Sequence, residues 1–282
     1  MRRLLIGDWH WTTGQPKARL DDYMDAQKRV LDWLINLCKK EKIDEIDQAG
    51  DFFDYWKQPH ELLTYLIHKL RELPPIVCCC GQHDLPRHSI ELYEKSAISI
   101  LQASGLVSHE PYCFHWDDKI KDTDSDIAII HIPIYHNDNP YKSENITPAI
   151  QLLKSTKYKL ILTGDNHQQF MLKDGDRYLV NPGSVHRTTA SQLSHTPAVY
   201  IYDGSTVERV EIPQNGVELT REHIEDARDK DERISMFVDR LETGYEKGLD
   251  FMGNLSTFFQ NNRVRTKVKD IVYECCDTDC NA

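Results

Sequence analysis

Five short motifs in this chain carry aspartate, histidine or amide side chains directly after an apolar run. They are Gly7-Asp8-Trp9-His10, Gly50-Asp51-Phe52-Phe53-Asp54, Gly81-Gln82-His83-Asp84, Ile129-Ile130-His131 and Gly164-Asp165-Asn166-His167. Carboxylate oxygen and imidazole nitrogen together suit Mn, Fe or Zn, and Mg where oxygen ligands predominate. The residue types therefore predict a divalent-metal centre, and their number predicts two ions.

The apolar runs indicate buried strands whose C-terminal ends release polar side chains into loops. Several such ends in one sheet converge on a crevice, which is where α/β proteins place their sites. Asp8 and His10 alternate along an extended segment, so both can face one ion only if the chain bends there. Asp51 follows a separate strand and is the natural bridge, because a carboxylate can give one oxygen to each ion.

A pair of metal ions about 3.5–4 Å apart can activate a water molecule and hold the oxygens of an in-line phosphoryl displacement. His83 is the expected general acid to the leaving oxygen, and Asp84 is expected to orient its ring. A single Gly-Asp after a strand usually marks a turn. Five motifs in the same strand-to-loop context make coincidence a poor explanation.

The order of these motifs resembles that of the calcineurin-like metallophosphoesterases, over about residues 3–185. Within that family the chain is similar to the Mre11/SbcD nuclease branch, particularly its short phage and bacterial DNA repair exonucleases. Residues 50–54 are similar to that branch's Gly-Asp-Leu-Phe-Asp, and residues 181–184 to its Tyr-Pro-Gly-Ser. Protein phosphatases of the family carry Arg after the second Asp, where this chain has Tyr55. That difference argues against a phosphomonoester-gripping arginine at this place.

The resemblance implies a ligand set for each ion. One ion would be held by Asp8, His10, Asp51 and His167, and the other by Asp51, Gln82, His131 and Asp165. Gln82 stands where the family has Asn, and Asp165 where it has His. Gln82 keeps the carbonyl ligand with one more methylene, and Asp165 exchanges a neutral nitrogen for an anionic oxygen. The second site is therefore expected to favour Mn or Mg over softer metals.

The function expected from the resemblance is a metal-dependent DNA exonuclease, with endonuclease activity also open, that uses two Mn²⁺ ions or alternatively Mg²⁺ or Fe²⁺. Asp54 and Trp56 are expected to bind substrate, because bases stack on exposed aromatic rings; core packing is the alternative for Trp9, Trp11 and Trp56. The expected partners are DNA and a Rad50/SbcC-like ATPase subunit, and a homodimer stays open. Two other functions also stay open: a small or cyclic nucleotide phosphodiesterase, and a degenerate scaffold for an ATPase.

Length and composition favour an enzyme of the cytoplasm. A chain of 282 residues can form one sizeable α/β domain with an appendage. No apolar stretch approaches the roughly 18 residues that span a membrane, and no signal peptide is visible. The eight cysteines indicate reduced thiols rather than a disulfide framework, with a weak alternative of metal binding by Cys275, Cys276 and Cys280.

The net charge of −11 is unusual for a protein of nucleic acids. Two divalent ions would offset several of the aspartates locally. No long basic stripe is present, so tight salt-driven binding to duplex DNA is not expected from this chain alone. The best local candidates lie in the tail at Arg263, Arg265, Lys267 and Lys269, where a solvated helix face is the alternative.

Periodicity predicts an α/β fold, namely a two-layer β-sandwich flanked by helices, with a C-terminal helical extension. The expected strands cover about 3–7, 44–49, 76–80, 112–116, 126–132 and 158–163, followed by hairpins to about 212. The expected helices cover about 21–41, 60–72, 89–103 and 147–155. Residues 1–213 form the expected catalytic domain. Residues 214–282 form a helical tail with apolar positions at helical spacing from Ile234 to Leu241 and near Phe258, which caps DNA, docks a partner or packs on the domain.

Overall fold

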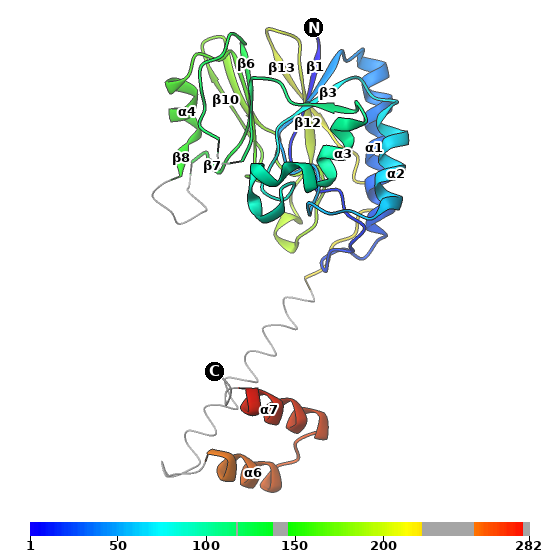
Figure 1. Ribbon diagram of the computed structural model, residues 1–282, viewed down its shortest axis with the longest axis vertical. Helices are drawn as coiled ribbons and strands as arrows, with labels where there is room; N and C mark the ends of the chain where they lie inside the picture. Colours follow the sequence, from blue (N-terminus) through cyan, green and yellow to red (C-terminus); the bar gives the residue numbers. More distant parts are fainter. Residues whose placement is uncertain (117, 138–145, 222–250, 279–282) are drawn as a thin grey trace. The chain divides into compact units, whose positions relative to one another are not determined.

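The computed structural model describes residues 1–116, 118–137, 146–221 and 251–278 (Figure 1). The chain divides into two compact units, Met1–Arg221 and Glu222–Ala282. The segment after Pro213 still belongs to the first unit, because Thr220 N donates a hydrogen bond to Ala18 O at 2.8 Å. The division therefore lies beyond the predicted boundary at residue 213.

The first unit contains two main sheets. The six-stranded sheet has the order β13-β12-β1-β2-β3-β4. Its strands are β1 Arg3–Ile6, β2 Glu45–Gln48, β3 Ile76–Cys78, β4 Val107–Ser108, β12 Ala198–Tyr202 and β13 Val207–Glu211. Strands β1 to β4 pair in parallel, whereas β12 and β13 are antiparallel additions at one edge.

The five-stranded sheet has the order β10-β11-β9-β6-β5. Its strands are β5 Cys113–Phe114, β6 Ile127–His131, β9 Leu160–Gly164, β10 Phe170–Asp174 and β11 Arg177–Asn181. A separate pair is formed by β7 Ile134–Tyr135 and β8 Thr147–Pro148. The predicted strands and the late hairpins are thus confirmed, whereas β4, β7 and β8 are too short to show a periodic pattern.

Helices cover the outer faces of both sheets (Figure 1). On the first sheet lie α1 Tyr23–Glu41, α2 His60–Leu70 and α3 Ala97–Ala103, and on the second lies α4 Ala149–Ser155. The period of two in β1 separates the layers: Leu4 and Ile6 pack under the helices, whereas Leu5 joins the core shared by the two sheets. The expected helix-flanked sandwich is confirmed.

The predicted helix over 89–103 is two elements. A 3₁₀ segment, Ile90–Lys95, precedes α3, and Ser96 between them has an extended backbone. The Ser96 side chain accepts a hydrogen bond from Ser99 N and so caps α3, which satisfies one of the unpaired N–H groups of a helix start. The N-cap at Ser96 thus divides the segment that apolar periodicity alone predicts as one helix.

The second unit contains α6 Phe251–Asn261 and α7 Thr266–Thr278. Leu255, Phe258 and Phe259 form its apolar cluster, packed by Val264 and Val272. The predicted helical stretch around Ile234 lies outside the described residues, as does Cys280. In the tail's basic group Arg263, Arg265 and Lys267 are exposed, while Lys269 Nζ donates to Phe259 O at 3.1 Å. None of the helices in the described part of the chain could cross a bilayer.

Candidate metal centre

The five motifs meet at one edge of the two sheets. Asp8 follows β1, Asp51 follows β2, and Gln82 follows β3; from the second sheet, His131 ends β6 and Asp165 follows β9. The chain does bend between Asp8 and His10, because His10 takes a left-handed backbone with φ 52°. Asp51 and Asp165 are left-handed too, at φ 47° and 76°. Backbone strain of this kind in non-glycine residues clusters at functional sites.

The first ligand group is formed by Asp8, His10, His167 and Asp51. His10 Nε2 lies 3.1 Å from His167 Nε2. His167 Nε2 lies 3.5 Å from Asp8 Oδ2, and His10 Nε2 lies 3.8 Å from Asp51 Oδ2. The predicted residues for one ion therefore converge with their ligand atoms facing one another.

The second ligand group is formed by His131, Gln82, Asp165 and Asp51. His131 Nε2 lies 2.9 Å from Gln82 Oε1, 3.4 Å from Asp51 Oδ2 and 4.0 Å from Asp165 Oδ1. Gln82 Nε2 donates to Asp165 Oδ1 at 2.9 Å. The two residues that depart from the family pattern thus bring carbonyl and carboxylate oxygens to the place where ligands are needed.

Asp51 joins the two groups, since its Oδ2 faces both His10 Nε2 and His131 Nε2. Its other oxygen, Oδ1, accepts a hydrogen bond from His83 N at 2.9 Å. Asp8 Oδ2 and Asp51 Oδ2 are both buried without a hydrogen-bond donor among the described residues. Buried carboxylate oxygens without donors are costly, and cations are the groups that compensate them. The donor set therefore fits two divalent ions.

Electrostatics differ between the histidines of the two groups. Burial lowers the pKa of His10 to about 3 and also lowers the pKa of His167, so burial favours the neutral form of both rings. Burial acts in the same direction on His131, but the carboxylates of Asp51 and Asp8 outweigh it and raise its pKa to about 10. His131 Nδ1 donates to Ala49 O at 2.6 Å, so Nε2 carries the second proton.

The carboxylates of the centre respond to the same surroundings. Burial raises the pKa of Asp8 well above its usual value, and the charge of Asp51 adds to this. Burial opposes ionisation of Asp51 as well, but the neighbouring His131 and His10 hold the pKa of Asp51 below its usual value. A divalent ion would stabilise the charged form of both carboxylates.

Close packing of backbone against side chain explains the glycines at these strand ends. A Cβ on Gly81 would lie 2.1 Å from Asp51 Oδ1, and one on Gly50 would lie 2.5 Å from His131 Nδ1. Gly50 also has φ 91°, which glycine adopts without a steric penalty. Only glycine lets these loops approach the ligands so closely.

His83 lies exposed beside the two groups, with its ring centroid 5.1 Å from that of His10. Its Nδ1 donates to the backbone oxygen of Asp54 at 2.8 Å, which leaves Nε2 for substrate. The expectation that Asp84 orients this ring is wrong. Asp84 is fully buried, and its carboxylate accepts hydrogen bonds from the backbone N–H groups of Phe52, Phe53 and Gly81 at 2.8–3.1 Å. Asp84 therefore fixes the loops after β2 and β3 that carry Asp51 and Gln82.

The predicted substrate residues lie at the mouth of the centre. Asp54 has a side chain 53% exposed, and its Oδ1 lies 3.6 Å from His10 Nδ1. Trp56 is half-buried and lines a cavity together with His83. Trp9 and Trp11 are fully buried in the core and serve packing.

A further group of potential ligands lies under the loop after β3. Cys80, His109 and His115 bring ligand atoms within 4.8 Å of one another. Hydrogen bonds occupy these rings: His109 Nδ1 donates to Cys78 O at 2.6 Å, and His115 Nδ1 accepts from Cys80 N at 2.9 Å. The group therefore fixes the loop that leads to Gln82. The five cysteines with described side chains are free thiols.

The sequence reasoning missed several residues around the centre. Arg87, His88 and Lys95 line the cavity beside His83, and Tyr23 and Thr188 line a smaller one of about 370 Å³ that reaches His10 and His167. None of them belongs to a motif. The only available signal was the basic pair Arg87-His88 directly after the His83 motif.

Comparison with known proteins now places this centre in a family. The family described as calcineurin-like phosphoesterase matches residues 1–169, more than half of the chain. The chain belongs to the calcineurin-like phosphoesterase family. Members of this family are phosphoesterases that bind divalent metals. The family membership predicted from the sequence motifs is therefore confirmed.

Two relatives are of the expected nuclease type. The chain is 30% identical over 114 residues to the DNA double-strand break repair protein Mre11 of Sulfolobus acidocaldarius, covering 36% of this chain and 29% of that protein. It is 37% identical over 94 residues to the SbcD component of the nuclease SbcCD of Bacillus subtilis, covering 30% of this chain and 22% of that protein. The matched stretches thus span less than a third of either relative. A solved structure described as a novel archaeal phosphodiesterase aligns over 75% of this chain and 99% of its own, at 14% identity and TM-score 0.42.

Proposed function

We propose that this chain is a metal-dependent DNA exonuclease that hydrolyses phosphodiester bonds; endonuclease activity stays open. The observation that carries the proposal is the shared carboxylate of Asp51, whose Oδ2 faces both ligand groups while its Oδ1 positions the backbone of His83. The Asp51 side chain thereby connects the proposed two-ion centre to His83, the candidate general acid. Asp8, His10 and His167 would complete the first site, and Gln82, His131 and Asp165 the second.

Two divalent ions bound here would supply a water nucleophile of lowered pKa and neutralise charge on the phosphate. Mn²⁺ fits a mixed set of imidazole and oxygen ligands best, while Mg²⁺ and Fe²⁺ suit the same residues less fully. The oxygens of Gln82 and Asp165 make the second site the harder of the two. A measured stoichiometry of one ion per chain in excess Mn²⁺ would refute the two-ion centre.

His83 would protonate the leaving oxygen. Its Nδ1 is held by the backbone oxygen of Asp54, so Nε2 is the atom that faces substrate. General acids in such positions contribute about 10²–10⁴-fold to the rate. Asp54, half exposed beside His10, would contact the substrate from the other side of His83.

A phosphodiester rather than a phosphomonoester is the proposed substrate because Tyr55 occupies the position of the monoester-gripping arginine. The name of the Mre11 relative refers to DNA and that of the SbcD relative to a nuclease, and together they support DNA as the polymer. The resemblance to the Mre11/SbcD branch implies a Rad50/SbcC-like ATPase, which we propose as the partner, with the tail as its docking segment. We place the enzyme in the cytoplasm, where buried thiols such as Cys79 remain reduced.

The decisive experiment compares labelled single- and double-stranded DNA, 3′,5′-cyclic AMP and bis-p-nitrophenyl phosphate in Mn²⁺. Cleavage of DNA without cyclic AMP hydrolysis supports the nuclease, and the reverse result supports the cyclic nucleotide phosphodiesterase. A His83→Ala variant should lose about 10²–10⁴-fold in DNA cleavage. Failure to hydrolyse any of these phosphodiesters would leave the ATPase scaffold.

A further inference from the structure

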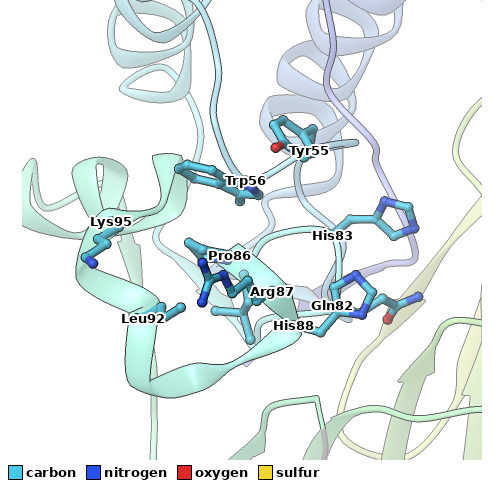
Figure 2. A pocket seen from close by; sticks show the side chains of 10 residues that line it. Tyr55, Trp56, Gln82, His83, Pro86, Arg87, His88, Leu92 and Lys95 are labelled. Carbon is cyan, nitrogen blue, oxygen red and sulfur yellow. The ribbon is translucent and has the colours of Figure 1, made fainter. Parts of the chain in front are cut away.

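A cavity of about 560 Å³ opens directly beside His83 (Figure 2). One wall is aromatic: Tyr55 and Trp56 come from the loop after β2, with ring centroids 5.4 Å apart. The other wall comes from the turns after β3 and carries three basic side chains, those of Arg87, His88 and Lys95. Its volume falls within the range of small-molecule sites, about 300–1,000 Å³.

The basic wall has an unusual backbone. Arg87 and His88 are consecutive non-glycine residues in the left-handed region, at φ 53° and 56°. His88 N donates to Leu85 O at 3.1 Å, and the preceding residues Leu85 and Pro86 are buried, so buried neighbours hold the turn. Residues held in this region cost free energy and persist where the surroundings determine them, often at ligand-binding sites.

The two walls are tied together. Ala97 N, at the start of α3, donates to Trp56 O at 2.7 Å. Trp56 therefore keeps its place relative to Lys95, which ends the 3₁₀ segment just before α3. The cavity is a preformed feature built by two segments that are far apart in the sequence.

The charge of this cavity is opposite to that of the chain. The chain carries −11, yet none of the ten described residues that line the cavity is acidic. The side chains of Arg87 and Lys95 make no ion pair or hydrogen bond with any part of the chain that the structure describes. Cations without a partner among the described residues, beside two aromatic rings inclined at 46° to each other, suit a ligand that has both an anionic group and a flat ring.

We propose that this cavity is a subsite for one unpaired nucleotide next to the scissile phosphate; the inference rests on the proposed nuclease function. The base stacks on Trp56 and Tyr55, and its phosphate is bound by Arg87 and Lys95, with His88 at the side of His83. A base in a duplex would have to unpair and unstack before it could enter this cavity, which costs free energy. The subsite therefore selects frayed ends and single strands.

The test of the aromatic wall compares two substrates: a thymidine oligonucleotide twelve nucleotides long, and an abasic oligonucleotide of the same length and charge. Wild type is expected to prefer the thymidine oligonucleotide in kcat/KM by about tenfold to a hundredfold, since stacking on aromatic rings has that effect. Trp56→Ala should bring this ratio close to one, and Trp56→Phe should restore most of it. A ratio that Trp56→Ala does not change would overturn the subsite.

The basic wall is tested by salt. Arg87→Asn, which tolerates a left-handed backbone, and Lys95→Gln should each weaken binding of both oligonucleotides. Each should reduce the slope of log affinity against log salt by about 0.7, the value for one phosphate contact on a single strand. Lys154→Gln, an exposed lysine on α4 away from every described cavity, is the matched control and should change neither quantity. Slopes equal to that of Lys154→Gln would remove these residues from the subsite.

Failure of the inference differs from failure of the proposed function. Wild type that hydrolyses bis-p-nitrophenyl phosphate but neither oligonucleotide nor duplex DNA is not a nuclease, and the subsite falls with the function. Wild type that cleaves duplex DNA but neither oligonucleotide is a nuclease without this subsite. Wild type that cleaves the thymidine and abasic oligonucleotides equally well is a nuclease without this subsite.

Discussion

The two ligand groups that share Asp51 differ in how far solvent reaches them. In the first group the His167 side chain is 45% exposed, whereas His131 in the second group is fully buried and held at Nδ1 by Ala49 O. The histidines of the first site thus line the smaller cavity of about 370 Å³, whereas the second site has a fully buried histidine and reaches the cavity beside His83 only through Gln82. An ion in the second site should exchange slowly and act as a stable reference, and one in the first site should exchange readily with solvent and substrate.

The largest expected effect comes from removing what the groups share. Asp51→Asn keeps the shape of the side chain and an acceptor for His83 N, but takes the negative charge from both sites. We expect kcat/KM on bis-p-nitrophenyl phosphate to fall on the order of 10³-fold, because each ion contributes several kcal/mol to the barrier. Metal content by mass spectrometry should fall for both ions. A variant that loses only one ion would show that Asp51 belongs to a single group.

The pH dependence of ion binding should differ between the two ligand groups, because binding at the second group displaces a proton from His131. His131, with a pKa raised to about 10, is protonated near neutral pH and must lose one proton when an ion binds, so affinity at the second group rises with pH by about tenfold per unit. The histidines of the first group have lowered pKa values and release no proton when an ion binds. Calorimetry in buffers of different ionisation enthalpy should show about one proton fewer released by His131→Asn. Unchanged proton release in that variant would contradict the assignment.

A smaller effect concerns metal preference. Asp165→His replaces an anionic oxygen by a nitrogen at the second group only, and should shift the ratio of Zn²⁺ to Mn²⁺ affinity there by about tenfold toward Zn²⁺. Competition titrations with a chelator measure both constants. His167→Asp, the opposite exchange in the first group, is the control and should shift that site toward Mn²⁺.

The smallest expected effect lies beneath both groups. Asp84→Asn leaves one of the backbone N–H groups of Phe52, Phe53 and Gly81 without an acceptor, at a cost of about 1–3 kcal/mol in the free energy of unfolding. Denaturant unfolding measures this loss, and kcat/KM should fall only severalfold. A loss as large as that of His83→Ala would restore the idea that Asp84 acts through the His83 ring.

The convergence of the proposed ligands could be predicted because each one ends or follows a buried strand, and apolar runs in the sequence indicate such strands. Asp8, Asp51 and Asp165 also stand next to glycines that the close packing requires. Sequence did not reveal the partner of Asp84, since its neighbour in the chain is His83 but its carboxylate reaches backbone N–H groups about thirty residues away. Adjacency along the chain was mistaken for contact.

The cavity beside His83 escaped prediction for a related reason. Trp56 and Lys95 come from segments about forty residues apart, joined by the hydrogen bond from Ala97 N to Trp56 O. The left-handed backbone of Arg87 and His88 depends on buried neighbours. Neither position holds a glycine or asparagine, the residues from which a left-handed conformation is usually predicted. Such features depend on tertiary structure and leave no local signal.

Asp51 uses its two oxygens for different purposes, and this has a thermodynamic consequence. Oδ1 accepts a hydrogen bond from the backbone N–H of His83, while Oδ2 faces both ligand groups, so binding of an ion at either proposed site and the placement of His83, the proposed proton donor, would be linked equilibria. Linkage is reciprocal, so a nucleotide gripped at His83 should tighten the hold on the ions by the same factor as the ions tighten the hold on the nucleotide. Substrate would thereby help to assemble the machinery that cuts it.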